Sequence, residues 1–547
     1  MGKRMSKLTL HLFKFLCALF FCITGAAMAA CPPPGATISG TPADSSQIGI
    51  ADNGTVIAVW REFDGVNTLI QSAFLIKGGN WSSPVTITSF NGDDGSASPQ
   101  IAVSGSSGNA VTIWEQFDTG SSTSFIYASV RPANTGTWTF PVQIDTGDTN
   151  SSFREQQIAI NTVGLDDYAV AVWSTDNGVK LFLESAWLNI VGFTPGSWSS
   201  PVNVDPSTSD NLGSPGIVVD TTGIAYAIWE NNNNFSIQTA TLPFNGPAWS
   251  SPVTLSPGLP SERYTQPKIA LGSIGFVAAI WRQRNAALTL FVQATTYQAG
   301  SWDLTPDTIS AGNTSVADLD IDADLTNNVV ALWREGSSLA QTIKSAYRPF
   351  VPGIWGSPLQ VSSVGVPSAT PDVTLISGTA YAVWTSTVGG FGSIEFATSN
   401  NGSVWSVPCT NISPLTDDSY PAHIVHDSPE YGVIVWDNHT IPAIQSAFFI
   451  PPPTVTAVSP TSGSLNGQNS VLITGTSFID VQYVEFGTGN YVPDFIVISS
   501  TEILAVAPSG PLAPPAVDVI VTTLIGPSLA NPPGDLYSFI NPICWQR

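Results

Sequence analysis

The sequence is poor in charge, and especially in positive charge. Only 10% of its 547 residues are charged, and 17 Lys and Arg stand against 40 Asp and Glu, which gives a net charge of −23. Charged residues ordinarily make up about a quarter of a globular protein. A protein that binds nucleic acid regardless of sequence needs a basic surface to neutralise phosphates, so this composition excludes nucleic acid as a partner.

Histidine and cysteine are also scarce, which leaves little material for metal or nucleophile chemistry. The five Cys include no Cys-x-x-Cys pair, so no zinc-site spacing is present. His423 and His426 are three residues apart and should therefore point to opposite faces of a strand. No Gly-x-Ser-x-Gly motif accompanies them. We expect no cofactor.

Long apolar runs are absent after residue 30, where none approaches the roughly 20 residues that a transmembrane helix needs. Residues 1–30 have the features of a secretory signal. Basic residues precede the apolar run Phe15–Thr24, and the Ala-x-Ala motif of residues 27–29 follows it. We therefore expect an exported protein, extracellular or in the bacterial cell envelope, with no transmembrane segment once the signal is removed.

Three cysteines remain after the signal, namely Cys31, Cys409 and Cys544. The segment Met28-Ala-Ala-Cys31 resembles a bacterial lipoprotein box, and that resemblance implies a lipid anchor on Cys31. Cys409 and Cys544 would then be left to form a disulfide. The alternative is ordinary cleavage at the Ala-x-Ala motif, with Cys31 free or bridged.

Internal repeats dominate the chain between the signal and residue 450. Eight Trp residues end short apolar runs at spacings of 51 to 59 residues: Trp60, Trp114, Trp173, Trp229, Trp281, Trp333, Trp384 and Trp436. A second Trp follows each of the first seven, and six of these second Trp residues open a Trp-x-x-Pro motif. In the fifth repeat the proline, Pro306, is displaced by one residue.

Each repeat contains four short β-branched or aromatic runs separated by Gly, Asn, Asp and Ser turns, and no amphipathic helix is apparent. Four-stranded repeats of about 50 residues indicate a β-propeller. The eighth repeat lacks its fourth strand, and residues 34–39 have the pattern of one. We therefore predict an all-β fold with an eight-bladed β-propeller over residues 31–450, closed by the N-terminal strand. The repeats resemble those of exported bacterial propellers, a group without a common activity.

The sequence changes character after the linker at residues 451–453. The segments Ser459-Pro-Thr-Ser-Gly463, Ile473-Thr-Gly-Thr-Ser-Phe478 and Val484-Glu-Phe-Gly487 resemble, in this order, the motifs of IPT/TIG domains. That resemblance implies an immunoglobulin-like sandwich over residues 454–541, which serves as a spacer or interaction module and carries no catalytic residues. Residues 542–547 form a C-terminal tail.

The sixth repeat holds an acidic cluster on its first predicted strand, Asp318-Leu-Asp320-Ile-Asp322-Ala-Asp324. Strand alternation puts these carboxylates on one face, and Ca²⁺ is bound by several oxygens. A straight strand, however, spreads successive carboxylates by about 6.6 Å, whereas calcium loops bend around the ion. Asp318, Asp320 and Asp322 are therefore weak metal candidates, and the favoured interpretation is a solvated channel wall.

The residue after each repeat Trp begins a loop at the end of the propeller where the blade-to-blade loops also lie. Its charge varies between blades, which is typical of recognition by loops on a regular scaffold. The candidate ligand-binding residues are Arg61, Phe63, Glu115, Phe117, Glu230, Arg282, Arg334 and Asp437. Six residues that open first strands are expected to line the nearby channel mouth: Gln47, Gln100, Gln157, Lys268, Asp318 and Asp372. The alternative is an ordinary solvated rim.

These patterns favour a non-catalytic secreted or cell-surface binding protein. The propeller would recognise a protein or glycan at the cell surface, and the IPT/TIG domain would be a spacer. One alternative is a carbohydrate-active enzyme, sialidase- or lyase-like, and another is a structural envelope component without a discrete ligand. Residues 398–405 form a degenerate copy of the sialidase Asp-box turn, but the other repeats lack it and no tyrosine nucleophile can be assigned.

Overall fold

A computed structural model gives the fold of the chain. It describes residues 36–540 except 41, 78, 89–95, 119–122, 147–154, 177, 207–210, 257–258, 260, 338–339, 401, 403, 411, 429–430, 450–452, 480, 511–515, 524–525 and 529. The predicted signal at 1–30, most of the linker at 451–453 and the tail at 542–547 lie outside the described residues, as do Cys31 and Cys544.

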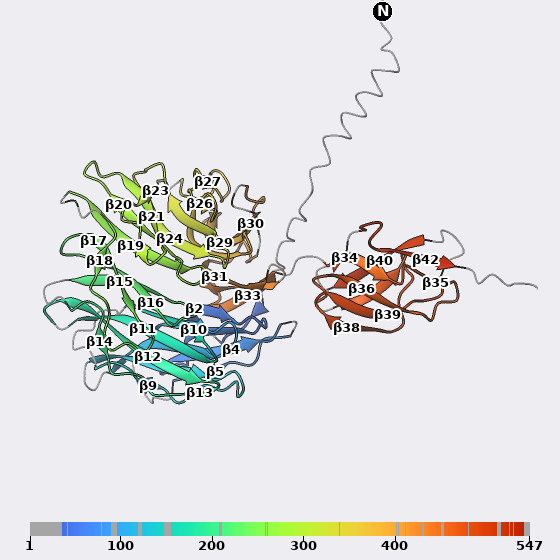
Figure 1. The fold of residues 1–547 in the computed structure, drawn as a ribbon, viewed down its shortest axis with the longest axis horizontal. Coiled ribbons are helices and arrows are strands. Elements are labelled where there is room, and N and C mark those ends of the chain that lie inside the picture. Colours follow the sequence, from blue (N-terminus) through green and yellow to red (C-terminus); the bar gives the residue numbers. More distant parts are fainter. Residues whose placement is uncertain are drawn as a thin grey trace, which may run out of the picture.

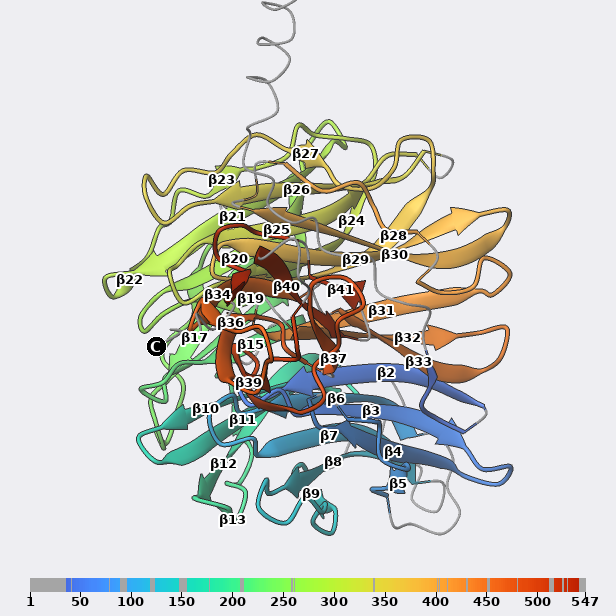
Figure 2. The ribbon, with the colours of Figure 1, turned by 90° about the vertical axis from the view of Figure 1, so that its right-hand side faces the viewer.

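Every regular element in the described ranges is a β-strand, so the predicted all-β class is confirmed. Figure 1 shows two bodies, a large ring of radiating sheets and a smaller sandwich built from the last strands. In Figure 2, viewed from the side of the sandwich, the sheets of the ring fan out behind it. No described segment forms a helix long and apolar enough to cross a membrane.

The ring consists, in the residues that the structure describes, of eight antiparallel sheets that we number along the chain. Sheet 1 contains β2 (Ala43–Ile50), β3 (Val56–Phe63), β4 (Thr68–Leu75) and β5 (Val85–Thr86). Sheet 2 contains β6 (Ser96–Val103), β7 (Ala110–Asp118), β8 (Thr123–Arg131) and β9 (Val142–Gln143). Sheet 3 contains β10 (Gln156–Val163), β11 (Asp166–Asp176), β12 (Leu181–Val191), β13 (Thr194–Pro195) and β14 (Val202–Asn203). Sheet 4 contains β15 (Leu212–Val219), β16 (Ala225–Asn231), β17 (Ser236–Leu242) and β18 (Val253–Thr254).

The second half of the ring repeats this pattern. Sheet 5 contains β19 (Arg263–Leu271), β20 (Val277–Arg284), β21 (Leu290–Gln298), β22 (Ser301–Trp302) and β23 (Asp307–Thr308). Sheet 6 contains β24 (Val316–Ala323), β25 (Val329–Glu335), β26 (Thr342–Arg348) and β27 (Leu359–Gln360). Sheet 7 contains β28 (Ser368–Ile376), β29 (Thr379–Val388) and β30 (Phe391–Asn400). Sheet 8 contains β31 (Ser419–Ser428), β32 (Tyr431–Asn438), β33 (Ala443–Phe449) and β1 (Ala36–Thr37).

The ring closes on itself at both its inner and its outer edge. The first strands β2, β6, β10, β15, β19, β24, β28 and β31 contact one another in this order, and β31 contacts β2. At the outer edge, β1 pairs with β33, with Ala36 opposite Ser446 and Thr37 opposite Gln445. The predicted N-terminal strand therefore completes the last sheet, and this pairing covers an edge that would otherwise be open.

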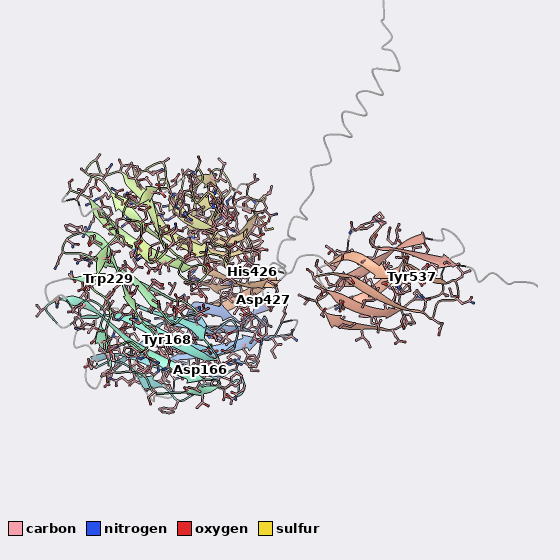
Figure 3. All side chains as sticks on the ribbon, in the orientation of Figure 1. Asp166, Tyr168, Trp229, His426, Asp427 and Tyr537 are labelled. Carbon is pink, nitrogen blue, oxygen red and sulfur yellow. The ribbon has the colours of Figure 1, made fainter. Side chains whose placement is uncertain are left out.

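The eight repeat Trp residues form the core of the ring, as predicted. Each is fully buried on the second strand of its sheet, and Figure 3 labels one of them, Trp229, in the larger body. Each indole N–H donates to a side-chain oxygen in its own sheet, over 2.9 to 3.4 Å. A buried indole needs such an acceptor, so the repeated Glu, Gln or Ser partner belongs to the same packing unit.

The sandwich is made of two sheets that follow the linker. One contains β34 (Thr454–Ser459), β36 (Ser470–Thr476), β38 (Phe495–Ser499) and β39 (Glu502–Val506). The other contains β35 (Ser462–Ser464), β37 (Val481–Phe486), β40 (Ala516–Thr523), β41 (Gly526–Pro527) and β42 (Leu536–Ile540). Phe486, Tyr537 and Phe539 lie in its core. Ile479 instead belongs to a buried cluster with Ile38 and Tyr431 of the ring, so the two bodies are in apolar contact.

Candidate functional site

One residue of each first strand occupies an equivalent place near the axis of the ring. It pairs with the residue that precedes the repeat Trp on the second strand. In chain order these residues are Gln47, Gln100, Gln157, Gly216, Lys268, Asp320, Asp372 and His423, and we call them the axial ring. The surrounding scaffold repeats, whereas the chemistry at this position changes from sheet to sheet.

The axial ring surrounds two adjoining cavities. Every member except Gly216 lines a cavity of about 410 Å³. Gly216 lines the neighbouring cavity of about 630 Å³, together with Gln100, Gln157, Lys268 and Asp320. A Cβ at position 216 would meet Ile228 Cγ2 at 3.0 Å and Ile269 Cγ2 at 3.2 Å, so these two side chains already fill the space beside Gly216. The channel mouth is therefore a polar cavity to which the fourth sheet adds no polar side chain at this position.

Half of the axial ring is fixed by hydrogen bonds between neighbouring sheets. The Nε2 amide nitrogen of Gln47 can only donate, so His423 Nε2 accepts from it over 3.2 Å. His423 Nδ1 then carries the proton and donates to Asp372 Oδ2 over 2.9 Å. Asp320 Oδ2 accepts the backbone N–H of Val373 over 2.9 Å. Gln47, Asp320, Asp372 and His423 thus form a continuous bonded arc across sheets 6, 7, 8 and 1.

Asp320 is the most perturbed acid of this arc. Burial, followed by the charge of the neighbouring Asp372, raises the pKa of Asp320 well above its usual range. The positive charge of Lys268 and the Val373 amide act in the opposite direction. The raised pKa of Asp320 reflects this position, because two ionised carboxylates side by side in a buried place would repel each other.

The other half of the axial ring is not fixed by side-chain hydrogen bonds. In the part of the chain that the structure describes, the side chains of Gln100, Gln157 and Lys268 make no hydrogen bond or ion pair. They come from sheets 2, 3 and 5, with Gly216 of sheet 4 between Gln157 and Lys268. Two amides and one ammonium group therefore face the 630 Å³ cavity with their donors and acceptors available. We call Gln100, Gln157 and Lys268 the free arc.

β-Bulges shape the mouth of the channel. In seven of the eight first strands the pairing register shifts just before the axial-ring residue or at its neighbour, as between Asp44 and Gln47 or between Thr265 and Lys268. Ser45, Gln266 and their counterparts in several other sheets adopt positive φ angles. A bulge withdraws backbone N–H groups from the strand ladder, and these groups need other acceptors.

Several of the predicted ligand-binding residues supply those acceptors. Asp437 accepts the backbone N–H of Ser45 over 2.6 Å and that of Ser46 over 3.1 Å, and Glu230 accepts that of Gln266 over 2.6 Å. Glu115, Glu230 and Asp437 are all buried. Burial raises the pKa of both Glu230 and Asp437. These carboxylates hold neighbouring sheets together, and a role in ligand binding stays a prediction.

The remaining predicted ligand-binding residues lie at the same end of the ring but are not brought together in one cavity. The three Arg residues are tied to first strands: Arg61 to Asp44 (2.7 Å), Arg334 to Asp318 (2.5 Å), and Arg282 to Thr265 Oγ1 (3.0 Å) and the Val316 carbonyl (3.3 Å). Phe63 is 43% exposed at the end of β3, and Phe117 is half-buried at the end of β7.

The Asp-rich strand of sheet 6 has an inter-sheet role. The bulge, with Asp318 at a φ of 51°, takes Asp318 out of the alternating series. Asp320, Asp322 and Asp324 each accept a backbone N–H of sheet 7, from Val373, Leu375 and Gly378, over 2.7 to 2.9 Å. Among the described residues, no group of three or more His, Cys, Asp or Glu is placed to hold a metal ion. The weak metal candidates Asp318, Asp320 and Asp322 therefore do not converge.

Sequence reasoning found most of the channel mouth but not all of it. Gln47, Gln100, Gln157, Lys268 and Asp372 lie together in the axial ring, as expected. Asp318 lines the larger mouth cavity, as expected, but the bulge puts Asp320 rather than Asp318 in the axial ring. Gly216 and His423 were missed. The signal that identifies all eight is their pairing with the residue before each repeat Trp, which requires the register of the bulged strands.

Cys409 is disulfide-bonded. It is buried in the cluster between sheets 7 and 8, where it contacts the side chains around Ile434 and Trp436. The predicted partner, Cys544, and the alternative, Cys31, both lie outside the described residues. The pairing with Cys544 and the lipidation of Cys31 stay predictions.

Comparison with known proteins identifies the second body. Residues 453–533 match the family model of the IPT/TIG domain, so the predicted C-terminal domain is confirmed. No curated protein matches the chain.

Solved structures resemble the chain in their arrangement of strands. A protein of unknown function from Dyadobacter fermentans is 13% identical, covering 58% of this chain and 97% of its own, with a TM-score of 0.37. A polysaccharide lyase of family PL25, an ulvan lyase, is 10% identical, covering 63% and 90%, with a TM-score of 0.44. A fucose-specific lectin from Aleuria aurantia is 10% identical, covering 57% and 94%, with a TM-score of 0.32. At these identities the likenesses concern the fold alone.

Proposed function

We propose that the protein is a non-catalytic, exported binding protein that holds a polar ligand at the mouth of the propeller channel. The free arc carries this proposal. Gln100, Gln157 and Lys268 present unpaired polar groups to a cavity of about 630 Å³, a size typical of ligand sites. Gln100 and Gln157 are half-buried and Lys268 is exposed. Three polar side chains without a hydrogen-bond partner around one cavity are available to an external partner.

The ligand belongs to the class that such groups recognise, a glycan or a polar segment of a cell-surface protein. Side-chain amides both donate to and accept from hydroxyl and peptide groups, and Lys268 adds an attraction for an oxygen acceptor. The IPT/TIG domain, joined to the ring through the cluster that contains Ile479, would hold the propeller away from the surface that carries it.

Binding without catalysis is favoured by the bonded arc. His423 and Asp372 form the kind of pair that supplies a general base, for which Nε2 must be available. In this protein Nε2 accepts from Gln47. Catalysis at the same mouth is the second candidate function, because the His423–Asp372 pair lies in a polar cavity. Incubation with a panel of uronate-containing polysaccharides tests it through the ultraviolet absorbance of unsaturated products, with His423→Ala as the comparison.

The binding proposal is tested with the purified protein, without its signal, on an array of glycans and cell-surface proteins. Each positive spot is then measured with Lys268→Gln and Gln157→Ala, which alter the free arc. Leu165→Glu is the control, because Leu165 is 94% exposed in the loop at the other end of β10. This substitution changes the net charge by the same amount as Lys268→Gln. We expect each free-arc variant to weaken binding about tenfold. Equal binding by all variants and the control would reject this location.

A further inference from the structure

A further cavity, separate from the two at the channel mouth, lies between sheets 5 and 6, and none of its lining residues belongs to the axial ring. Its volume is about 600 Å³. Trp302, Asp303 and Asp307 of sheet 5 line it, and Arg348 and Trp355 line it from sheet 6. Trp302 is buried in the core cluster that contains Trp281, whereas Trp355 is half-buried and packs against the next core cluster.

The cavity lies where a contact between neighbouring sheets is missing. At three other junctions the second Trp of a repeat donates its indole N–H to a serine on the third strand of the preceding sheet, which we call the Trp–Ser latch. The pairs are Trp81 with Ser446 (2.9 Å), Trp249 with Ser185 (2.7 Å) and Trp405 with Ser345 (2.8 Å). Each of these serines pairs across its sheet with the residue before a repeat Trp.

Ala294 occupies the corresponding place in sheet 5, because it pairs with Ile280, the residue before Trp281. Its methyl group cannot accept a hydrogen bond, and both Ala294 and Trp355 line the cavity. Within the described residues, the indole N–H of Trp355 makes no hydrogen bond. The missing hydroxyl therefore leaves an indole donor available at this junction.

Two acids of repeat five line the same cavity as Trp355. Repeat five has one extra residue between Trp302 and Pro306. In this segment the backbone N–H of Thr305 (2.9 Å) and its hydroxyl (2.5 Å) both donate to Asp303 Oδ1. These bonds lower the pKa of Asp303, so it is ionised. Asp303 and Asp307 are both exposed at the cavity wall. Opposite them, Arg348 is buried, and its Nη1 has no hydrogen-bond partner.

We propose that this cavity binds a neutral monosaccharide unit of a glycan. Trp355 supplies a donor, Asp303 and Asp307 supply acceptors, and sugar hydroxyls can satisfy both because they donate and accept. The buried Arg348 supplies a positive charge at the cavity wall. The half-buried indole ring of Trp355 offers flat apolar surface to the C–H face of a pyranose. Two carboxylates against one guanidinium disfavour an anionic sugar, and the net charge of −23 acts in the same direction. The proposal is independent of the channel mouth.

The test uses the protein without its signal and neutral methyl glycosides of glucose, galactose, mannose and fucose at millimolar concentrations, with methyl glucuronide as the anionic comparison. Saturation-transfer difference NMR reports which glycosides bind, and titration gives their affinity. We expect at least one neutral glycoside to bind and the glucuronide not to bind. No binding by any neutral glycoside, or binding of the glucuronide alone, would overturn the proposal.

Three variants locate the site. Trp355→Phe keeps an aromatic ring and removes the indole donor, and Ala294→Ser supplies the hydroxyl that completes a Trp–Ser latch. Both should weaken glycoside binding about fivefold to tenfold, and Ala294→Ser should do so without loss of thermal stability. Trp405→Phe is the matched control, because Trp405 is already latched to Ser345. Unchanged affinity in both Trp355→Phe and Ala294→Ser would place the sugar elsewhere and reject this site.

Discussion

Asp437 should be a major determinant of ring stability, because it joins the last sheet to the first. Its carboxylate accepts three hydrogen bonds from β2, namely the N–H of Ser45 (2.6 Å), the N–H of Ser46 (3.1 Å) and the Ser46 hydroxyl (2.6 Å). Asp437 is 3% exposed and Ser46 is fully buried. D437A therefore leaves three donors at a buried junction without their acceptor.

The expected loss follows from those donors. An unsatisfied buried donor costs about 1–3 kcal/mol. Part of this cost is offset because D437A no longer buries a carboxylate. The burial of that carboxylate is what raises the pKa of Asp437. We expect D437A to lower the free energy of unfolding by about 3–5 kcal/mol. D437N retains one acceptor oxygen and should lose about half as much.

Urea unfolding followed by tryptophan fluorescence measures this loss in the propeller, because every Trp except Trp545 precedes the IPT/TIG domain. E230A is the matched control, since Glu230 makes one such bond, to Gln266, at the junction of sheets 4 and 5. Its expected loss is about 1–2 kcal/mol. A D437A loss no larger than that of E230A would refute the reasoning that these carboxylates act by satisfying bulge amides.

Three further predictions concern the scaffold. Deletion of residues 31–40 removes β1 from sheet 8 and should lower the melting temperature clearly, and an unchanged melting temperature would mean that β1 does not contribute to closure. W229A removes a fully buried indole and should lower the free energy of unfolding by about 3–5 kcal/mol in urea titration, so unchanged stability would contradict a core role. Burial raises the pKa of Asp322 from 3.8 to about 7. Between these pH values the folded chain therefore retains a proton that the unfolded chain releases, so the free energy of unfolding falls as the pH rises. D322N removes this proton, so its melting temperature relative to the natural chain should increase from pH 5 to pH 8, whereas a constant difference would argue against a raised pKa.

The repeat itself could be predicted because its determinants are local. Trp229 and its seven counterparts lie at the end of short apolar runs, and burial of the indole follows from strand pattern and spacing alone. The closing strand could be predicted for a related reason. The eighth repeat lacks a fourth strand, and residues 34–39 have the sequence pattern of one. The IPT/TIG domain is marked by motifs that stand in order along a short segment.

The site could be predicted only in part because inter-sheet bonds are not local. Glu230 and Asp437 have the sequence appearance of variable rim residues, and only the bulge on the next sheet shows that their carboxylates accept backbone N–H groups. The same bulge moves Asp320, rather than Asp318, into the axial ring. Bulge positions depend on pairing register, which no single repeat encodes.

Closure of the ring through its two ends has a consequence for how the chain acquires its structure. Ser39 and Ile444, which are hydrogen-bonded in sheet 8, are 405 residues apart in sequence. Contacts at such separation form late, because the entropy of a very long loop must be overcome first. Sheets 1 to 7 can form as each segment becomes available, but the final sheet requires residues 419–449. Until then the chain has an unpaired strand edge and is most prone to aggregate.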